Sequence, residues 1–146
     1  MQTASTNVPT SVRENKMIEK AQEKVIKSTR WISALTIEKL AQIESSDKSA
    51  VVTKWKAAQK IFSVNYLSEE LYPVYAFDAQ NGYQPAEVLK PIIELFLGKK
   101  DSWGIAYWFA SANGFLGGKS PQDILEIDPA RVLRAALDEV RGITHG

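Results

Sequence analysis

An aromatic-rich segment that ends in glycines constrains the fold of this chain more than any other stretch. The segment spans residues 103–123, and its first half carries aromatic residues at three- and four-residue steps, which predicts a helix with a broad buried flank formed by Trp103, Tyr107, Trp108 and Phe109. An Asn-Gly pair at 113–114 and a Gly-Gly pair at 117–118 permit the positive φ angles that end a helix. Ser120, followed by proline, predicts the N-cap of a new helix.

The composition is typical of a soluble globular protein and excludes several classes of enzyme. Hydrophobic residues make up 45% of the chain and charged residues 24%, and no apolar run is long enough to cross a membrane. Because the N-terminus is polar and has no signal-peptide core, we expect a cytoplasmic protein without membrane contact. Cysteine is absent, and the one histidine, His145, lies next to the last residue. We therefore expect no catalytic residue, no metal site and no cofactor, which means a protein that is not an enzyme.

The charge is unevenly distributed although the net charge is only +1. Residues 1–60 contain 11 Lys/Arg and 6 Asp/Glu, whereas residues 61–146 contain 7 and 11. A basic N-terminal half is compatible with nucleic-acid binding, and it is equally compatible with a solvated helix face. Charge alone leaves both interpretations open.

The first 30 residues form one unit, a polar tail followed by an amphipathic helix. Apolar residues from Val12 to Ile26 recur near helical spacing, and Glu23 and Lys27 are placed for an ion pair one turn apart. A helix over residues 11–27 would expose Met17 and Ile18 unless something covers them. We therefore expect residues 1–30 to pack against another surface, for which a second copy of the chain in a homodimer is the simplest candidate.

Residues 31–80 are predicted to form a helix-turn-helix followed by a β-hairpin. One helix is expected within residues 31–43 with Ser33 as N-cap, and a second over residues 49–60. Period-two stretches at 61–67 and 71–77, separated by a turn at 68–70, indicate the hairpin, with Pro73 placing the second strand at a sheet edge. The hairpin is either the wing of a winged helix that reaches DNA or a cover for the helical core.

The lysines of residues 48–60 are the candidate DNA contacts of this unit. They can meet phosphates, Asn65 on the hairpin can add a contact, and Trp55 faces either DNA or the core. The predicted DNA-binding residues are Lys48, Lys54, Lys56, Lys60 and Asn65.

Residues 81–146 are predicted to form an all-helical domain of about four helices. A turn-rich loop at 78–85 marks the domain boundary. A helix over 86–97 contains Pro91, which is able to kink it, and Gly98 ends it. The aromatic helix, a helix over 120–125 and a last helix over 130–140, stopped at 141–142, complete the domain. The expected fold class is thus mainly α, with an N-terminal helix-turn-helix and β-hairpin wing.

Residues 85–141 resemble the toxin-binding domain of the Xre/MbcA/ParS-type antitoxins. The motif that carries the resemblance is a tryptophan-bearing helix with Trp108 and Asn113, then Leu-Gly-Gly-Lys-Ser-Pro-Gln-Asp-Ile-Leu at 116–125, then Arg-Val-Leu at 131–133. The resemblance implies an all-helical domain that binds and blocks a partner toxin, commonly an NAD-consuming or ADP-ribosylating RES-type enzyme. It also implies operator binding by the N-terminal part, which here is closer to a winged or MerR-like arrangement than to the multi-helix Xre domain of typical members.

These observations predict an antitoxin-like, DNA-binding transcriptional regulator that also binds a protein partner. The alternative is a protein-interaction module that makes no contact with DNA. Arg134 and Arg141 are seven residues apart and share a helix face, which either meets an acidic partner surface or is only solvated. The predicted partner-binding residues are Gly117, Gly118, Lys119, Arg131, Arg134 and Arg141.

Overall fold

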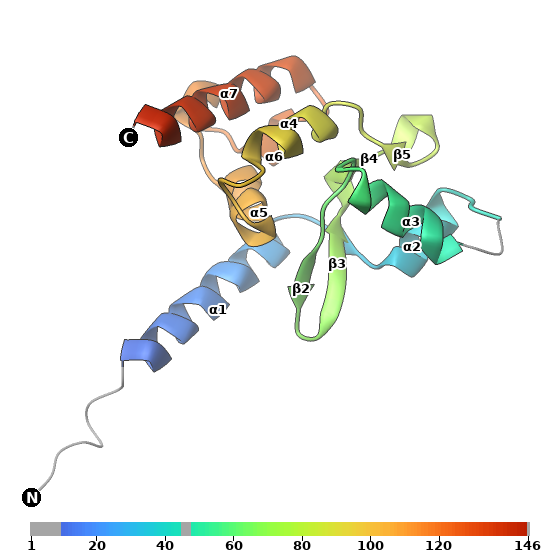
Figure 1. Ribbon diagram of the computed structural model, residues 1–146, viewed down its shortest axis with the longest axis horizontal. Coiled ribbons are helices and arrows are strands. Elements are labelled where there is room, and N and C mark those ends of the chain that lie inside the picture. The colour runs from blue at the N-terminus through green and yellow to red at the C-terminus, as the bar shows by residue number, and fades with distance from the viewer. Residues whose placement is uncertain (1–9, 45–47, 146) are drawn as a thin grey trace, which may run out of the picture.

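The computed structural model describes residues 10–44 and 48–145, which form a mainly helical protein with small antiparallel sheets (Figure 1). The mainly α fold class is confirmed. The α-helices are α1 (Thr10–Ser28), α2 (Ala34–Leu40), α3 (Lys48–Ala57), α4 (Leu89–Phe96), α5 (Ser102–Ala110), α6 (Pro121–Ile124) and α7 (Pro129–His145). The strands are β1 (Trp31–Ile32), β2 (Val64–Tyr66), β3 (Glu69–Pro73), β4 (Phe77–Asp78) and β5 (Gln84–Pro85).

The three-stranded sheet has the order β1-β3-β2, so β3 is its central strand. The prediction that Pro73 places this strand at an edge is therefore wrong, because Trp31, expected in a helical unit, forms β1 instead and pairs with Pro73. A proline is tolerated here because it is the last residue of β3, and the next ladder bond runs from Val74 N to Arg30 O at 2.9 Å. Ser33 is the N-cap of α2, as expected, and accepts a hydrogen bond from Thr36 N at 3.2 Å.

The turn of the β2-β3 hairpin lies one residue earlier than the sequence predicts. Tyr66 pairs with Glu69, which leaves Leu67 and Ser68 as a two-residue turn with φ angles of 50° and 65°. Two positive φ angles define a type I′ turn, which normally uses Asn-Gly. Leucine in this position is 83% exposed, so its apolar side chain does not compensate for the backbone strain.

The loop at 78–85, expected to be irregular, contains a second small hairpin. Phe77 pairs with Pro85 and Asp78 with Gln84, and a 3₁₀ turn at Ala79–Asn81 joins the two strands. The strands are too short for a period-two pattern to reveal them.

Helices α2 and α3 end earlier than the apolar pattern suggests because each is stopped by a left-handed glutamine. Gln42 has a φ of 53° and Gln59 a φ of 63°. Backbone hydrogen bonds from Ile43 N to Glu38 O (3.0 Å) and from Lys60 N to Trp55 O (2.9 Å) then satisfy carbonyl groups in the last turns of α2 and α3.

The structure describes four α-helices within residues 81–145, as expected, but two of their boundaries differ. Helix α4 starts at Leu89, so Pro91 lies in its first turn. The backbone N–H groups of the first turn have no acceptor within the helix, so the N–H that proline lacks costs no hydrogen bond there. Pro91 is therefore not expected to kink α4. Helix α7 continues through Gly142 to His145 and is not stopped at 141–142. A single glycine is compatible with a helix when nothing after it breaks the backbone hydrogen bonding.

One cluster of buried hydrophobic residues extends from Val25 to Ala136 and includes both sides of the predicted boundary at residue 80. Phe62 lies 6.2 Å and Tyr75 4.8 Å from Phe109 of α5, measured between ring centroids. The division into 31–80 and 81–146 stays a prediction, and any such units share a core.

Helix α1 packs on the rest of the protein only by its C-terminal half. Val25 is buried there, and Ser28 accepts a 3.0 Å hydrogen bond at Oγ from Gln122 of α6. The N-terminal half extends away from the other elements (Figure 1), with Met17 70% and Ile18 53% exposed. The expectation that these side chains are covered is not met within the described chain.

Helices α2 and α3 contact each other and precede the hairpin, which is the element order of a winged helix-turn-helix. Their connection covers residues 41–47, of which 45–47 lie outside the described part of the chain. This is longer than the three- or four-residue turn of that motif. The helix-turn-helix with a wing therefore stays a prediction.

The strained hairpin turn predicts a stabilising double substitution. Replacing Leu67 with Asn and Ser68 with Gly should raise the free energy of unfolding by about 1–2 kcal/mol, because both residues tolerate positive φ. Urea denaturation measures the gain. The control is Leu97→Asn, since Leu97 is also exposed but has a φ of −56°. Equal or lower stability of the turn variant would contradict the assigned turn type.

Candidate functional site

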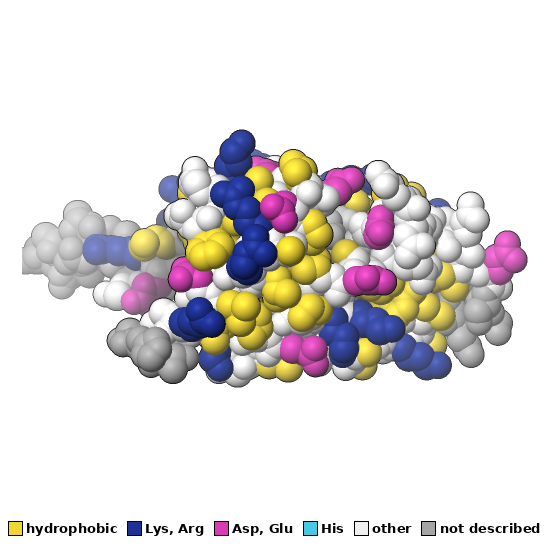
Figure 2. Space-filling model, turned by 90° about the horizontal axis from the view of Figure 1, so that it is seen from above, with side chains coloured by type: hydrophobic (Ala, Val, Ile, Leu, Met, Phe, Trp, Pro, Cys, Tyr) yellow, Lys and Arg dark blue, Asp and Glu magenta, His cyan; other side chains and the backbone are white. Residues whose placement is uncertain are grey.

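Two of the predicted DNA-binding lysines, Lys54 and Lys56, do not share a face of α3. Lys54 and Lys60 are exposed, whereas Lys56 is bound by an acidic side chain of the hairpin, and the side chain of Lys48 lies outside the described ones. Because an α-helix turns about 100° per residue, Lys54 and Lys56 leave α3 on nearly opposite sides. On the face seen from above, Lys and Arg side chains occur in separate groups among hydrophobic and acidic ones (Figure 2). That face has no single basic patch.

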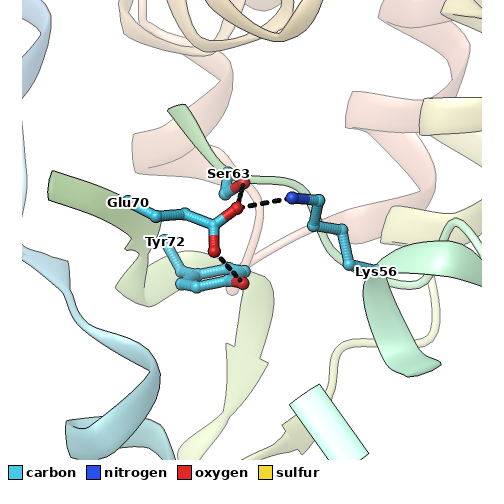
Figure 3. Close-up of polar contacts among 4 residues, drawn as sticks. All are labelled: Lys56, Ser63, Glu70 and Tyr72. Atoms are coloured by element: carbon cyan, nitrogen blue, oxygen red, sulfur yellow. Dashed lines mark hydrogen bonds and ion pairs between the residues drawn. The ribbon is translucent and has the colours of Figure 1, made fainter. Parts of the chain in front are cut away.

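Lys56 belongs to a polar cluster centred on Glu70 (Figure 3). The Glu70 carboxylate accepts hydrogen bonds from Lys56 Nζ at 2.5 Å, from Ser63 Oγ at 2.8 Å and from the Tyr72 hydroxyl at 3.1 Å. The hydrogen bond from Lys56 is the largest cause that lowers the pKa of Glu70, with smaller contributions from Ser63 and Tyr72. Burial, reinforced by the charge of Glu70, raises the pKa of Tyr72. The cluster ties α3 to the hairpin, which is a structural role.

Two further candidate residues of this unit, Trp55 and Asn65, lie in different environments. Trp55 is half-buried against Phe77, with ring centroids 6.3 Å apart, so it faces the core. Asn65 is exposed on β2 and lines a small hollow of about 290 Å³ together with Lys56 and Asp101. An acidic neighbour makes this hollow a poor phosphate site.

The glycine-containing segment forms a closed turn between α5 and α6. Asn113 Oδ1 accepts from Phe115 N at 2.9 Å, the amide of Gly118 donates to Asn113 O at 2.8 Å, and Asn113 N donates to Lys119 O at 3.0 Å. Gly117 and Gly118 have φ angles of 68° and 89°, as the sequence predicts. The Ser120 side chain makes no capping hydrogen bond, contrary to expectation, although the following proline is in the first turn of α6.

The predicted partner-binding residues lie on this turn and along α7. Gly117, Gly118 and Lys119 are exposed, and an added Cβ at Gly117 would be 3.9 Å from Arg131 Nη2, so the turn and the start of α7 are adjacent. Arg134 and Arg141 are exposed further along α7. At 1.5 Å per residue, Arg131 and Arg141 are about 15 Å apart along the helix axis. Within the described residues, none of these arginines forms an ion pair.

A cleft of about 580 Å³ between α5 and α7 is a feature that the sequence analysis missed. Its walls include Tyr107, Trp108, Phe115 and Asp138. Tyr107 is 52% exposed and Phe115 44%, so the expectation that Tyr107 is buried is wrong. Helical spacing places Tyr107 near the other aromatics, but α5 is covered on fewer sides than its composition suggests. We call the exposed residues Tyr107, Phe115, Gly117, Gly118, Lys119, Arg134, Asp138 and Arg141 the α5–α7 surface.

Two other features are absent from residues 10–44 and 48–145. That part of the chain contains no group of three or more His, Cys, Asp or Glu side chains arranged to hold a metal ion. None of its helices is long and apolar enough to span a membrane.

Comparisons with protein-family models, with curated proteins and with solved structures found no match to this chain. The resemblance to the antitoxin family therefore stays a prediction that rests on its sequence motif.

The Glu70 cluster predicts a pH-dependent contribution to stability. Because the pKa of Glu70 is lowered below 4.5 in the folded chain, the contribution is complete above about pH 4.5 and is lost as the pH falls through the folded pKa. Glu70→Gln should therefore lower the melting temperature at pH 7, and the difference from the parent chain should narrow at pH 3. Glu69→Gln, at the neighbouring exposed position, is the control. A difference that is the same at both pH values would refute the assignment.

The glycine turn predicts a position-specific effect of adding a methyl group. Gly118→Ala should lower the free energy of unfolding by about 1–2 kcal/mol, because the cost arises from the positive φ and not from a clash. Gly114→Ala should be close to neutral, since Gly114 does not have a positive φ and no atom lies within 4 Å of its added Cβ. Thermal denaturation of both variants measures the contrast. Equal effects would mean that the turn is not held in this conformation.

Proposed function

We propose that this chain is an antitoxin-like, non-catalytic regulator of the cytoplasm that binds a protein partner through the α5–α7 surface. The observation that carries the proposal is the exposure of two aromatic side chains, Tyr107 and Phe115, beside the cleft and the glycine turn. Exposed aromatic residues next to a hollow are enriched at protein interfaces, where they act as anchors. The turn that bears Phe115 belongs to the segment that resembles the antitoxin motif.

A RES-type toxin is the partner that this resemblance suggests. The arginines of α7 are in a position to contact acidic groups of such a partner, because Arg134 and Arg141 are exposed and form no ion pair within the described residues. The exposed Met17 and Ile18 of α1 support homodimerisation as a further part of the proposal.

The partner-binding proposal predicts which variants lose affinity. The probe is the purified product of the reading frame next to this gene, and binding is measured by calorimetry. Tyr107→Ala and Phe115→Ala should each weaken binding by about tenfold or more, as anchors at interfaces do. The control is Leu35→Ala, because Leu35 is 61% exposed on α2, away from this surface. Unchanged affinity in both aromatic variants would contradict the proposed surface.

DNA binding by α3 is the second candidate function. It is favoured by the exposure of Lys54 and Lys60, which form no ion pair within the described chain, and disfavoured by the engagement of Lys56 with Glu70. If Lys56 is removed from the predicted set, three lysines remain, and the side chain of one of them, Lys48, lies outside the described ones. Two or three lysines are too few for a strong phosphate surface on one copy of the chain. A dimer would double that number.

The DNA proposal is tested by the salt dependence of binding to the DNA upstream of the gene. If Lys54 and Lys60 each contact a phosphate, their double replacement with Gln should reduce the slope of log K against log salt by about two units. Lys56→Gln, the control, should leave the slope unchanged. A salt response that is flat in the parent chain would rule out this function.

A further inference from the structure

One carboxylate that lines the cleft between α5 and α7 forms no ion pair within the described residues. Glu139 forms a 3.0 Å ion pair with Lys100, so these two charges balance each other at the wall. Asp138, on the same wall, is exposed and forms no ion pair within the described residues. Arg134 and Arg141 flank Asp138 along α7 but do not line the cleft. The carboxylate of Asp138 is therefore available to a cation that enters from outside.

Aromatic side chains line the same cleft as this carboxylate. Tyr107 and Phe115 line the same cleft and expose about half of their surface, whereas Trp108 forms an almost fully buried part of the wall. Faces of aromatic rings attract cations, and a guanidinium group both stacks on rings and binds carboxylates with two parallel hydrogen bonds. This combination distinguishes arginine from other side chains as an occupant.

Trp108 contributes apolar wall to the cleft and no free polar group. Its side chain is only 6% exposed, and its indole Nε1 is buried without a hydrogen-bond partner within the described chain. A group that enters the cleft therefore contacts the ring of Trp108 and does not reach its N–H. The indole N–H still reports a change in the wall, because it belongs to a residue that lines the cleft.

We propose that the cleft between α5 and α7 binds an arginine side chain of the partner protein, with its guanidinium between the aromatic rings and the carboxylate of Asp138. The inference rests on the proposed partner binding and specifies the chemistry that is recognised. A volume of about 580 Å³ exceeds what one side chain needs, so the cleft also has room for the adjoining backbone. An acidic side chain is disfavoured there, because it would face the unpaired Asp138.

The experiment is a titration of the full ¹⁵N-labelled chain with a small arginine probe, N-acetyl-arginine methylamide, followed by NMR. The neutral citrulline analogue is the matched probe, since it has nearly the same shape and no charge. We expect saturable shifts of the Trp108 indole N–H and of the Gly114 and Phe115 amides. The arginine probe should bind about tenfold more tightly than the citrulline probe, as an ion pair and a cation–π contact together predict.

Variants of the chain make the test specific. Asp138→Asn should remove the preference for arginine over citrulline, and Asp123→Asn, which changes an exposed acid of α6, should retain it. The amide spectrum of each variant shows that it is folded. Equal binding of the two probes, shifts confined to residues outside the cleft, or a preference that survives Asp138→Asn would overturn the inference. Because the probes need no partner, failure here is distinguishable from failure of the partner-binding proposal.

Discussion

Aromatic packing around one phenylalanine ring lies at the centre of the core that the two halves of this protein share. Phe109 of α5 is fully buried and lies 4.8 Å from Tyr75, 6.2 Å from Phe62 and 5.0 Å from Trp108, measured between ring centroids. The first two rings belong to the sheet region and the third to α5 itself, so the orientation of α5 depends on this contact. The Tyr75 hydroxyl is buried without a partner in the described residues, and burial raises its pKa. The aromatic contacts offset the cost of that buried hydroxyl.

The position of α5 in turn determines which of its faces remains open. Phe109 and Trp108 face the core, and Tyr107 is left on the side where α5 and α7 diverge. The closed turn after α5 presents Phe115 at the same place because Gly117 and Gly118 adopt the positive φ angles that it requires. The exposed aromatic part of the α5–α7 surface thus follows from core packing and turn geometry.

Much of the fold could be predicted from the sequence, whereas the candidate site could be predicted only in part. Helical periodicity, the Ser33 cap and the paired glycines identified elements that depend on local interactions. The strand at Trp31 and the central place of β3 depend on partners about 40 residues away, which no local pattern reveals. The same holds for the cleft, which lies between α5 and α7, and for the pairing of Glu70 with Lys56, a lysine that the sequence predicts to contact DNA.

The central claim is that partner contact occurs on the α5–α7 surface and not on α3. Hydrogen–deuterium exchange of the full chain, alone and with the purified product of the neighbouring reading frame, tests it directly, because amide protection maps a buried interface. The account predicts slower exchange within residues 107–119 and 134–141 in the complex, with α3 and the β2-β3 hairpin unchanged. Protection confined to α3 and the hairpin, or none within the α5–α7 surface when binding is saturated, would contradict it.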